Sequence, residues 1–122
     1  SQENPMHFPW TFPELITGRK FDQFQSGLEA RFEAKRINYK LTYGEPTAKP
    51  AMWMDYKTDS AIGRVTLWES GECDMEVLDV ESGDDLLRET HTFPNADAFF
   101  DSYPKVPNLV YTHSYGSRME ED

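Results

Sequence analysis

The sequence of 122 residues and 14.2 kDa fits one domain, which buries roughly two-thirds of the surface of its unfolded chain. Twenty-two Asp and Glu against 12 Lys and Arg give a net charge of −10, which disfavours nucleic acid and anionic membranes and favours basic partners. No apolar run exceeds the four residues 51–54, so we expect no membrane-spanning segment. The single Cys73 excludes an internal disulfide and favours a cytoplasmic protein.

The first third of the sequence predicts an arm followed by a helix. Residues 1–19 contain Pro5, Pro9 and Pro13 among aromatic residues, and each proline disfavours the α region for the residue before it, so we expect an extended Pro/aromatic arm. A long helix is predicted over 20–36, because apolar residues recur there at steps of three and four. One face of this helix then carries Phe21, Phe24, Leu28 and Phe32.

Alternation of apolar and polar residues predicts strands after this helix. The predicted strands cover 37–43, 51–57, 61–69, 73–80 and 86–93. Because most of the connections between them are short, neighbouring strands are expected to run antiparallel.

The C-terminal part predicts one more helix. Asn95 is placed to start a short helix that ends before Pro104, and 104–115 is expected to add an extended piece. The predicted fold class is therefore α+β: an antiparallel meander of four or five strands packed against one long N-terminal helix, plus a short C-terminal helix. Residues 20–115 form the single predicted domain, and 116–122 a disordered acidic tail.

Groups that could carry catalysis are scarce. His7, His91 and His113 lie far apart and outside any metal-ligand spacing. Cys73 stands next to acidic residues, which disfavour a reactive thiolate, so an inward-facing strand residue is the better interpretation. No nucleotide-binding or nucleophile motif occurs. The sequence therefore predicts a protein without a cofactor or metal that is not an enzyme.

Negative charge is concentrated in the second half of the chain. Residues 69–101 carry eleven carboxylates and one basic side chain, Arg88. A strand that buries Cys73 would turn its carboxylates outward, which predicts a flat anionic surface. That surface would consist of Glu69, Glu72, Asp74 and Glu76. It serves either solubility alone or recognition of a basic protein.

Two tryptophans add a possible anchor to this surface. Trp53 and Trp68 fall in predicted strands, and we expect at least one large ring among Trp53, Tyr56 and Trp68 to face outward. Large aromatic side chains are favoured anchors of protein interfaces. The alternative is that Trp68 covers the sheet beneath the N-terminal arm.

The segment 62–81, IGRVTLWESGECDMEVLDVE, resembles TriTu-type immunity proteins of bacterial polymorphic (Rhs, type VI secretion) toxin systems. In that family a strand ending G-R-(I/V)-T-(V/L)-W-E-S-G leads through a tight turn into an acidic strand ending L-D-V-E. The resemblance implies a cytoplasmic antitoxin that blocks the active-site cleft of a cognate toxin domain in a 1:1 complex. It also implies that the toxin is an ADP-ribosyltransferase acting on elongation factor Tu.

Together with the surface pattern, this resemblance makes six residues the candidate toxin-binding set. They are Trp53, Trp68, Glu69, Glu72, Asp74 and Glu76. Two other functions stay open from the sequence: an acidic adaptor domain for another basic protein, and a small cofactor-free enzyme with its pocket between helix and sheet.

Overall fold

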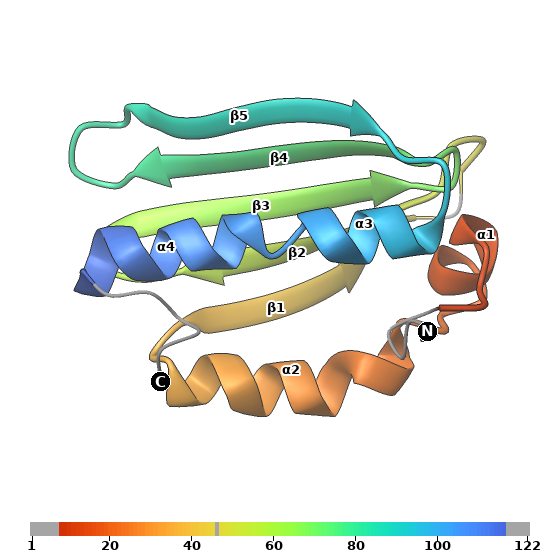
Figure 1. Cartoon of the computed structure of the whole chain (residues 1–122), viewed down its shortest axis with the longest axis horizontal. Coiled ribbons are helices and arrows are strands. Elements are labelled where there is room, and N and C mark those ends of the chain that lie inside the picture. Colours follow the sequence, from red (N-terminus) through yellow and green to blue (C-terminus); the bar gives the residue numbers. More distant parts are fainter. Residues whose placement is uncertain (1–7, 46, 117–122) are drawn as a thin grey trace, which may run out of the picture.

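The computed structural model describes residues 8–45 and 47–116 and contains one five-stranded sheet. All neighbouring strands are antiparallel and follow chain order (Figure 1), so the predicted meander is confirmed with five strands. The strands are β1 (Asn38–Tyr43), β2 (Ala51–Lys57), β3 (Ala61–Trp68), β4 (Glu72–Asp79) and β5 (Asp85–Thr92).

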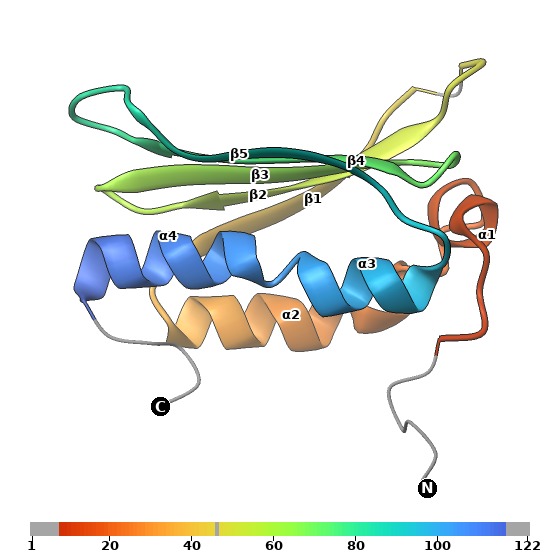
Figure 2. The same cartoon turned by 45° about the horizontal axis from the view of Figure 1, so that its top comes forward.

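Four helices accompany the sheet: α1 (Phe12–Ile16), α2 (Asp22–Ala34), α3 (Ala96–Ser102) and α4 (Lys105–Tyr115). Figure 2 shows α2, α3 and α4 on one side of the sheet. Helix α4 packs mainly across β3 and β4, whereas α2 runs alongside β1. The described chain thus forms two layers, with one face of the sheet left without helices.

The prediction that one long N-terminal helix is the main partner of the sheet is wrong. The first helix is the short α1 with five residues, and α2 has 13. The longest helical stretch is C-terminal, where α3 and α4 follow each other with seven and eleven residues. The expected apolar face of α2 exists, but it packs against the β1 side of the sheet, with Phe32 fully buried and Phe24 and Leu28 partly buried.

Residues 105–115 form helix α4 rather than the expected extended piece. Pro104 precedes the helix and Pro107 lies in its first turn, where a backbone N–H has no acceptor within the helix, so neither proline interrupts it. Val106 and Val110 are one helical turn apart and both buried. Gly116 ends the helix in the left-handed conformation, with φ of 80°.

The arm predicted to be extended contains helix α1. Thr11 and Glu14 form a reciprocal capping box at its start, in which each side chain accepts a hydrogen bond from the backbone of the other residue. Phe12, Leu15 and Ile16 are buried by this turn of helix. Of the rest of the predicted arm, residues 1–7 lie outside the described residues, as do 117–122 of the predicted acidic tail.

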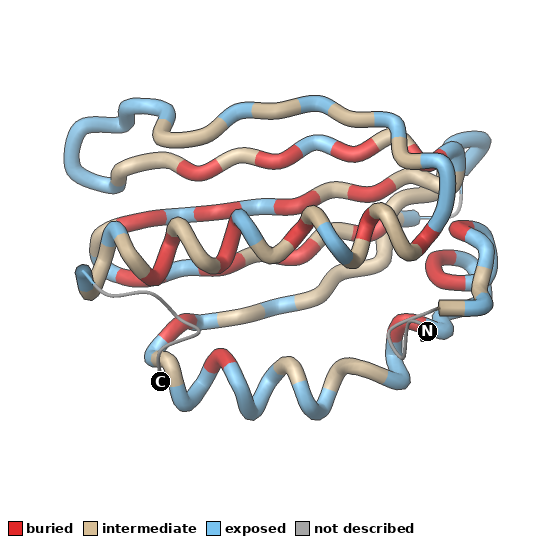
Figure 3. Tube along the Cα trace, viewed as in Figure 1, coloured by how far each residue is buried: buried red, intermediate tan, exposed pale blue. Residues whose placement is uncertain are grey.

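The core lies between the sheet and the helix layer. Alternate residues of β2, β3 and β4 are buried toward the helices (Figure 3). Gly63 on β3 permits the close approach of α4, because a Cβ there would lie 2.8 Å from Val110 and 2.9 Å from Val106. Gly71 adopts φ of +94° in the β3–β4 turn, where a Cβ would meet the Phe93 carbonyl oxygen at 2.5 Å. Both glycines of the G-R-V-T-L-W-E-S-G segment therefore serve the fold.

Candidate interaction surface

The sheet face opposite the helices, here called the outer face, is the main uncovered surface among the described residues. Figure 2 shows the β1–β2 and β4–β5 connections bending away from the helix layer on this side. The strand register arranges the outward side chains in rows. One row contains Thr42, Trp53, Thr66, Asp74 and Thr90, and the next contains Lys40, Asp55, Arg64, Glu76 and Arg88.

Both tryptophans lie on the outer face, at the end near the β1–β2 loop. Trp53 follows the buried Met52 in β2, and Trp68 follows the buried Leu67 in β3. Both tryptophans are half-buried. The Lys49 ammonium lies 5.2 Å from the centre of the Trp68 ring, and the Arg64 guanidinium lies 5.5 Å from that of Trp53. A cation that lies over the face of an aromatic ring is attracted by the electrons of that ring. We call this region, with Glu72, the tryptophan end.

Phe8 and Trp10 of the N-terminal arm pack on the helix side of the sheet. Phe8 stacks on Phe100 with ring centres 4.0 Å apart, and Trp10 meets Phe24 edge-on at 5.7 Å. These contacts place this part of the arm against α2 and α3, on the helix side. Residues 1–7 of the arm lie outside the described residues, so the alternative of Trp68 beneath the arm stays a prediction.

Glu72, Asp74 and Glu76 lie on the outer face as predicted, but they do not make it uniformly anionic. Lys49 pairs with Glu72 at 2.9 Å, and Arg88 with Glu76 at 3.3 Å. The hydrogen bond from Lys49 is the main cause that lowers the pKa of Glu72. Asp74 accepts a hydrogen bond from the Thr90 hydroxyl at 3.3 Å. The face is mixed in charge, because basic residues from other parts of the chain sit beside its carboxylates.

Glu69 is separated from the other five candidate residues. It lies in the β3–β4 turn, where its carboxylate accepts a hydrogen bond from the Thr17 hydroxyl at the end of α1. Its backbone N–H donates to the Pro50 carbonyl at 3.2 Å. The structure thus brings Trp53, Trp68, Glu72, Asp74 and Glu76 onto one face and places Glu69 at its corner, toward the helix side.

The opposite end of the outer face holds residues that the sequence interpretation missed. Ile62 is 39% exposed and Val80 45%, and they are the exposed large aliphatic residues of the described chain. Ile62 stands directly opposite Leu78 in the register. Its position between buried Ala61 and buried Gly63 in a strand was the available signal. We call this region, with turns 58–60 and 80–84, the turn end.

The thiol and the two histidines of the described chain are buried or paired. Cys73 is fully buried, and burial followed by the charge of Asp74 raises its pKa to about 12, so its thiol stays protonated near neutral pH. His91 pairs with Glu89 at 2.8 Å and His113 with Asp79 at 2.7 Å. Within residues 8–45 and 47–116, no three His, Cys, Asp or Glu side chains gather as metal ligands.

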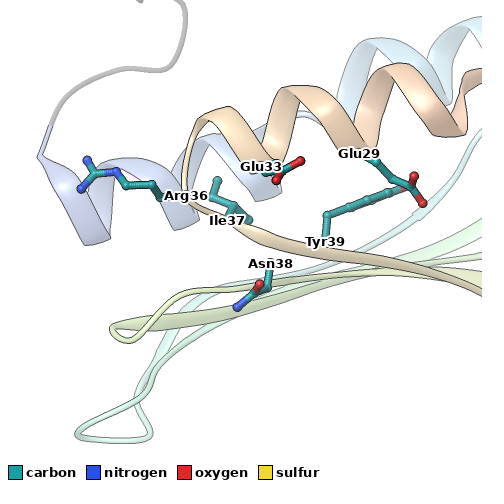
Figure 4. A pocket seen from close by; sticks show the side chains of 6 residues that line it. All are labelled: Glu29, Glu33, Arg36, Ile37, Asn38 and Tyr39. Carbon is teal, nitrogen blue, oxygen red and sulfur yellow. The ribbon is translucent and has the colours of Figure 1, made fainter.

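A pocket of about 410 Å³ lies where α2 passes into β1. It is lined by Glu29, Glu33, Arg36, Ile37, Asn38 and Tyr39. Figure 4 shows the Arg36 side chain extending away from the other lining residues. The Tyr39 hydroxyl donates to Gln25 at 2.8 Å, and burial raises its pKa, so it is not poised as a base.

Comparison with known proteins gives one family. The family model described as Immunity protein TriTu matches residues 14–108, which run from α1 into α4 and include the whole sheet. A search of curated proteins found no match. Among the described residues, no helix has both the length and the apolar character needed to cross a membrane.

Proposed function

Since this chain belongs to the TriTu immunity protein family, we propose that it protects its cell by binding a cognate toxin domain and covering the active-site cleft of that toxin. Membership supports an antitoxin that acts by binding a protein and not by catalysis. The buried Cys73 and the paired histidines fit such a role, because none of them is available as a nucleophile or free base.

The toxin that we propose is an ADP-ribosyltransferase acting on elongation factor Tu, delivered as part of an Rhs protein by type VI secretion. The resemblance of residues 62–81 to the family supports this choice. Because elongation factor Tu works in the cytoplasm, the antitoxin would act there too. The net charge of −10 supports a protein partner and opposes binding to nucleic acid or to anionic membranes.

The observation that carries the proposal is the uncovered outer face. A stable complex buries about 1,600 Å² in total, or about 800 Å² on each partner, and a five-stranded face without helices offers a continuous surface for this. We assign the contact in a 1:1 complex to Trp53, Trp68, Glu72, Asp74 and Glu76, with Glu69 at its corner. The two rings supply anchors, and the ion pairs supply complementary polar contacts.

The test measures stoichiometry. Purified toxin domain encoded by the neighbouring gene modifies elongation factor Tu with labelled NAD, while increasing amounts of the immunity protein are added. A binding inhibitor stops the label at about one immunity protein per toxin, whereas an enzyme that reverses the modification protects at much lower ratios. Full protection far below equimolar amounts would contradict the proposal.

Two variants serve as controls in the same assay. Cys73→Ser and His91→Ala should keep full protection at the same ratio, because neither side chain has a chemical role in a binding inhibitor. Growth of cells that co-express toxin and immunity protein, followed by co-purification, gives the corresponding result in vivo. A folded variant that binds the toxin but no longer protects would reopen the catalytic alternative.

A further inference from the structure

The turn end combines two exposed aliphatic groups, Ile62 of strand β3 and Val80 of the β4–β5 turn. Ile62 of β3 faces Leu78 of β4, and the backbone N–H of Val80 donates to the Ser60 carbonyl at 2.9 Å. Val80 therefore lies next to the β2–β3 turn, one step beyond Leu78 on the same parity. Exposed aliphatic side chains that adjoin one another favour contact with another apolar surface.

Carboxylates without partners surround these aliphatic residues. Asp59 lies in the β2–β3 turn, and Glu81 and Asp84 lie in the β4–β5 turn. All three are exposed, and none of their side chains forms a hydrogen bond or ion pair with another described residue. Lys57, opposite Ile62 in the register, and Arg36, which lines a pocket together with Lys57 and Asp59, are basic residues near this end. The turn end keeps an excess of unneutralised negative charge.

The longer of the two turns is held in one conformation by its own hydrogen bonds. The Gly83 N–H donates to the Asp79 carbonyl at 2.8 Å, and the Asp79 N–H to the Asp84 carbonyl at 2.9 Å. The Asp79 carboxylate accepts from the Ser82 N–H at 2.8 Å and pairs with His113 of α4 at 2.7 Å. A turn fixed in this way loses little conformational entropy when a partner binds.

From this arrangement we propose that the turn end is the anchoring contact for the toxin, and that it receives an apolar toxin side chain flanked by lysine or arginine. This inference rests on the proposed function and names the chemistry of the partner at one part of the outer face. Charge decides between occupants, because two copies of this chain would bring like-charged turns together, whereas a toxin segment with basic residues would neutralise Asp59, Glu81 and Asp84.

The first arm of the test removes the aliphatic groups. We measure the Kd of the full chain for the toxin domain encoded by the neighbouring gene, with the wild type and Ile62→Ser/Val80→Ser. We expect the Kd to rise at least tenfold, and a smaller rise overturns the inference. Thermal melting checks that the variant is folded.

The second arm removes charge and does not depend on the first. Asp59→Asn/Glu81→Gln/Asp84→Asn should lower the association rate constant at least fivefold at low salt, with a difference that shrinks as salt rises. The matched control, Glu29→Gln/Glu33→Gln/Asp101→Asn, removes three carboxylates from α2 and α3 on the helix side and should change the rate less than twofold. Equal effects of the two triple variants overturn the inference.

The outcomes separate this inference from the proposed function. Wild-type protein that neither binds nor protects against the toxin refutes both. Wild-type protein that binds and protects, with unchanged turn-end variants, overturns the turn-end contact and leaves the function in place. A wild-type dimer in sedimentation experiments that Ile62→Ser/Val80→Ser converts to monomer assigns the surface to a second copy, which also overturns it.

Discussion

At the tryptophan end of the outer face, rings and carboxylates already have partners within the chain: Lys49 lies over Trp68 and pairs with Glu72, and Arg64 lies over Trp53. At the turn end, by contrast, aliphatic side chains stand exposed beside carboxylates that have no partner in the described chain. At the tryptophan end, a toxin must displace side chains that already have partners. At the turn end, it can contact exposed side chains directly. Counting charges along the sequence does not distinguish the two.

The arrangement at the tryptophan end is easily undone. Exposed ion pairs contribute about 0–1 kcal/mol to stability. A partner that replaces Lys49 or Arg88 at its carboxylate therefore sacrifices little free energy of folding. We therefore expect both ends to contact the toxin, with contact beginning at the turn end. Four predictions examine this difference, starting with the largest effect.

The largest effect comes from opening the core between the sheet and the helix layer. Phe99 of α3 is fully buried and stacks on Tyr103 with ring centres 5.4 Å apart. Phe99→Ala should lower the free energy of unfolding by about 3–5 kcal/mol, because it removes buried surface and leaves a cavity. Urea unfolding measures this loss. Unchanged stability would mean that Phe99 does not contribute to the core.

Charge reversal compares the two ends directly. Asp59→Lys/Glu81→Lys/Asp84→Lys should weaken toxin binding about 100-fold, or about 2.7 kcal/mol, because three unpaired carboxylates become cations that face a basic surface. Glu72→Lys/Asp74→Lys/Glu76→Lys should weaken it by more than tenfold but less than the turn-end triple. Both are measured by titration calorimetry at low salt. The reverse order would move the first contact to the tryptophan end.

The cation over Trp68 offers a finer comparison. Trp68→Ala should weaken toxin binding about tenfold, since the ring is a proposed anchor. Lys49→Met removes the cation and should change the Kd less than threefold, because the ammonium has to leave the ring when the toxin binds. Surface plasmon resonance distinguishes these values. Equal losses in both variants would show that the cation and the ring are recognised together.

The smallest effect is a dependence of the folding stability on pH, caused by Asp79 at the turn end. Hydrogen bonds from His113 and Ser82 lower the pKa of Asp79 from 3.8 to about 2. Because its pKa is lower in the folded state, Asp79 contributes stability that is present above about pH 4 and is lost as the pH falls toward 2. Urea midpoints of wild type and Asp79→Asn should therefore converge over this range. Parallel curves would show that the pair does not stabilise the fold.

Residue alternation was enough to predict all five strands, since buried and exposed positions in β2, β3 and β4 follow a period of two. Helix α4 was missed because Pro104 was expected to end the helical part of the chain, although a proline at a helix start is tolerated. The four-residue spacing of Val106 and Val110, with Gly116 beyond, was the signal for a helix.

The surface was predicted less completely than the fold. The outward direction of Asp74 and Glu76 follows from alternation, but their neighbours do not. Arg88 reaches Glu76 from the next strand and Lys49 reaches Glu72 from a loop 23 positions away, so both pairs depend on strand register. Local sequence contains the charge of each side chain and not the charge that folding places beside it.

The order of the strands also bears on how fast this protein becomes active. Every strand of the meander pairs with the strand next to it in the chain, so no pairing in the sheet has to wait for a distant segment. Chains dominated by such local pairings fold faster than those that join remote parts, because less loop entropy is lost before the first contacts form. A newly synthesised molecule can therefore reach its binding-competent state soon after it leaves the ribosome, which shortens the interval in which its cognate toxin would meet no inhibitor.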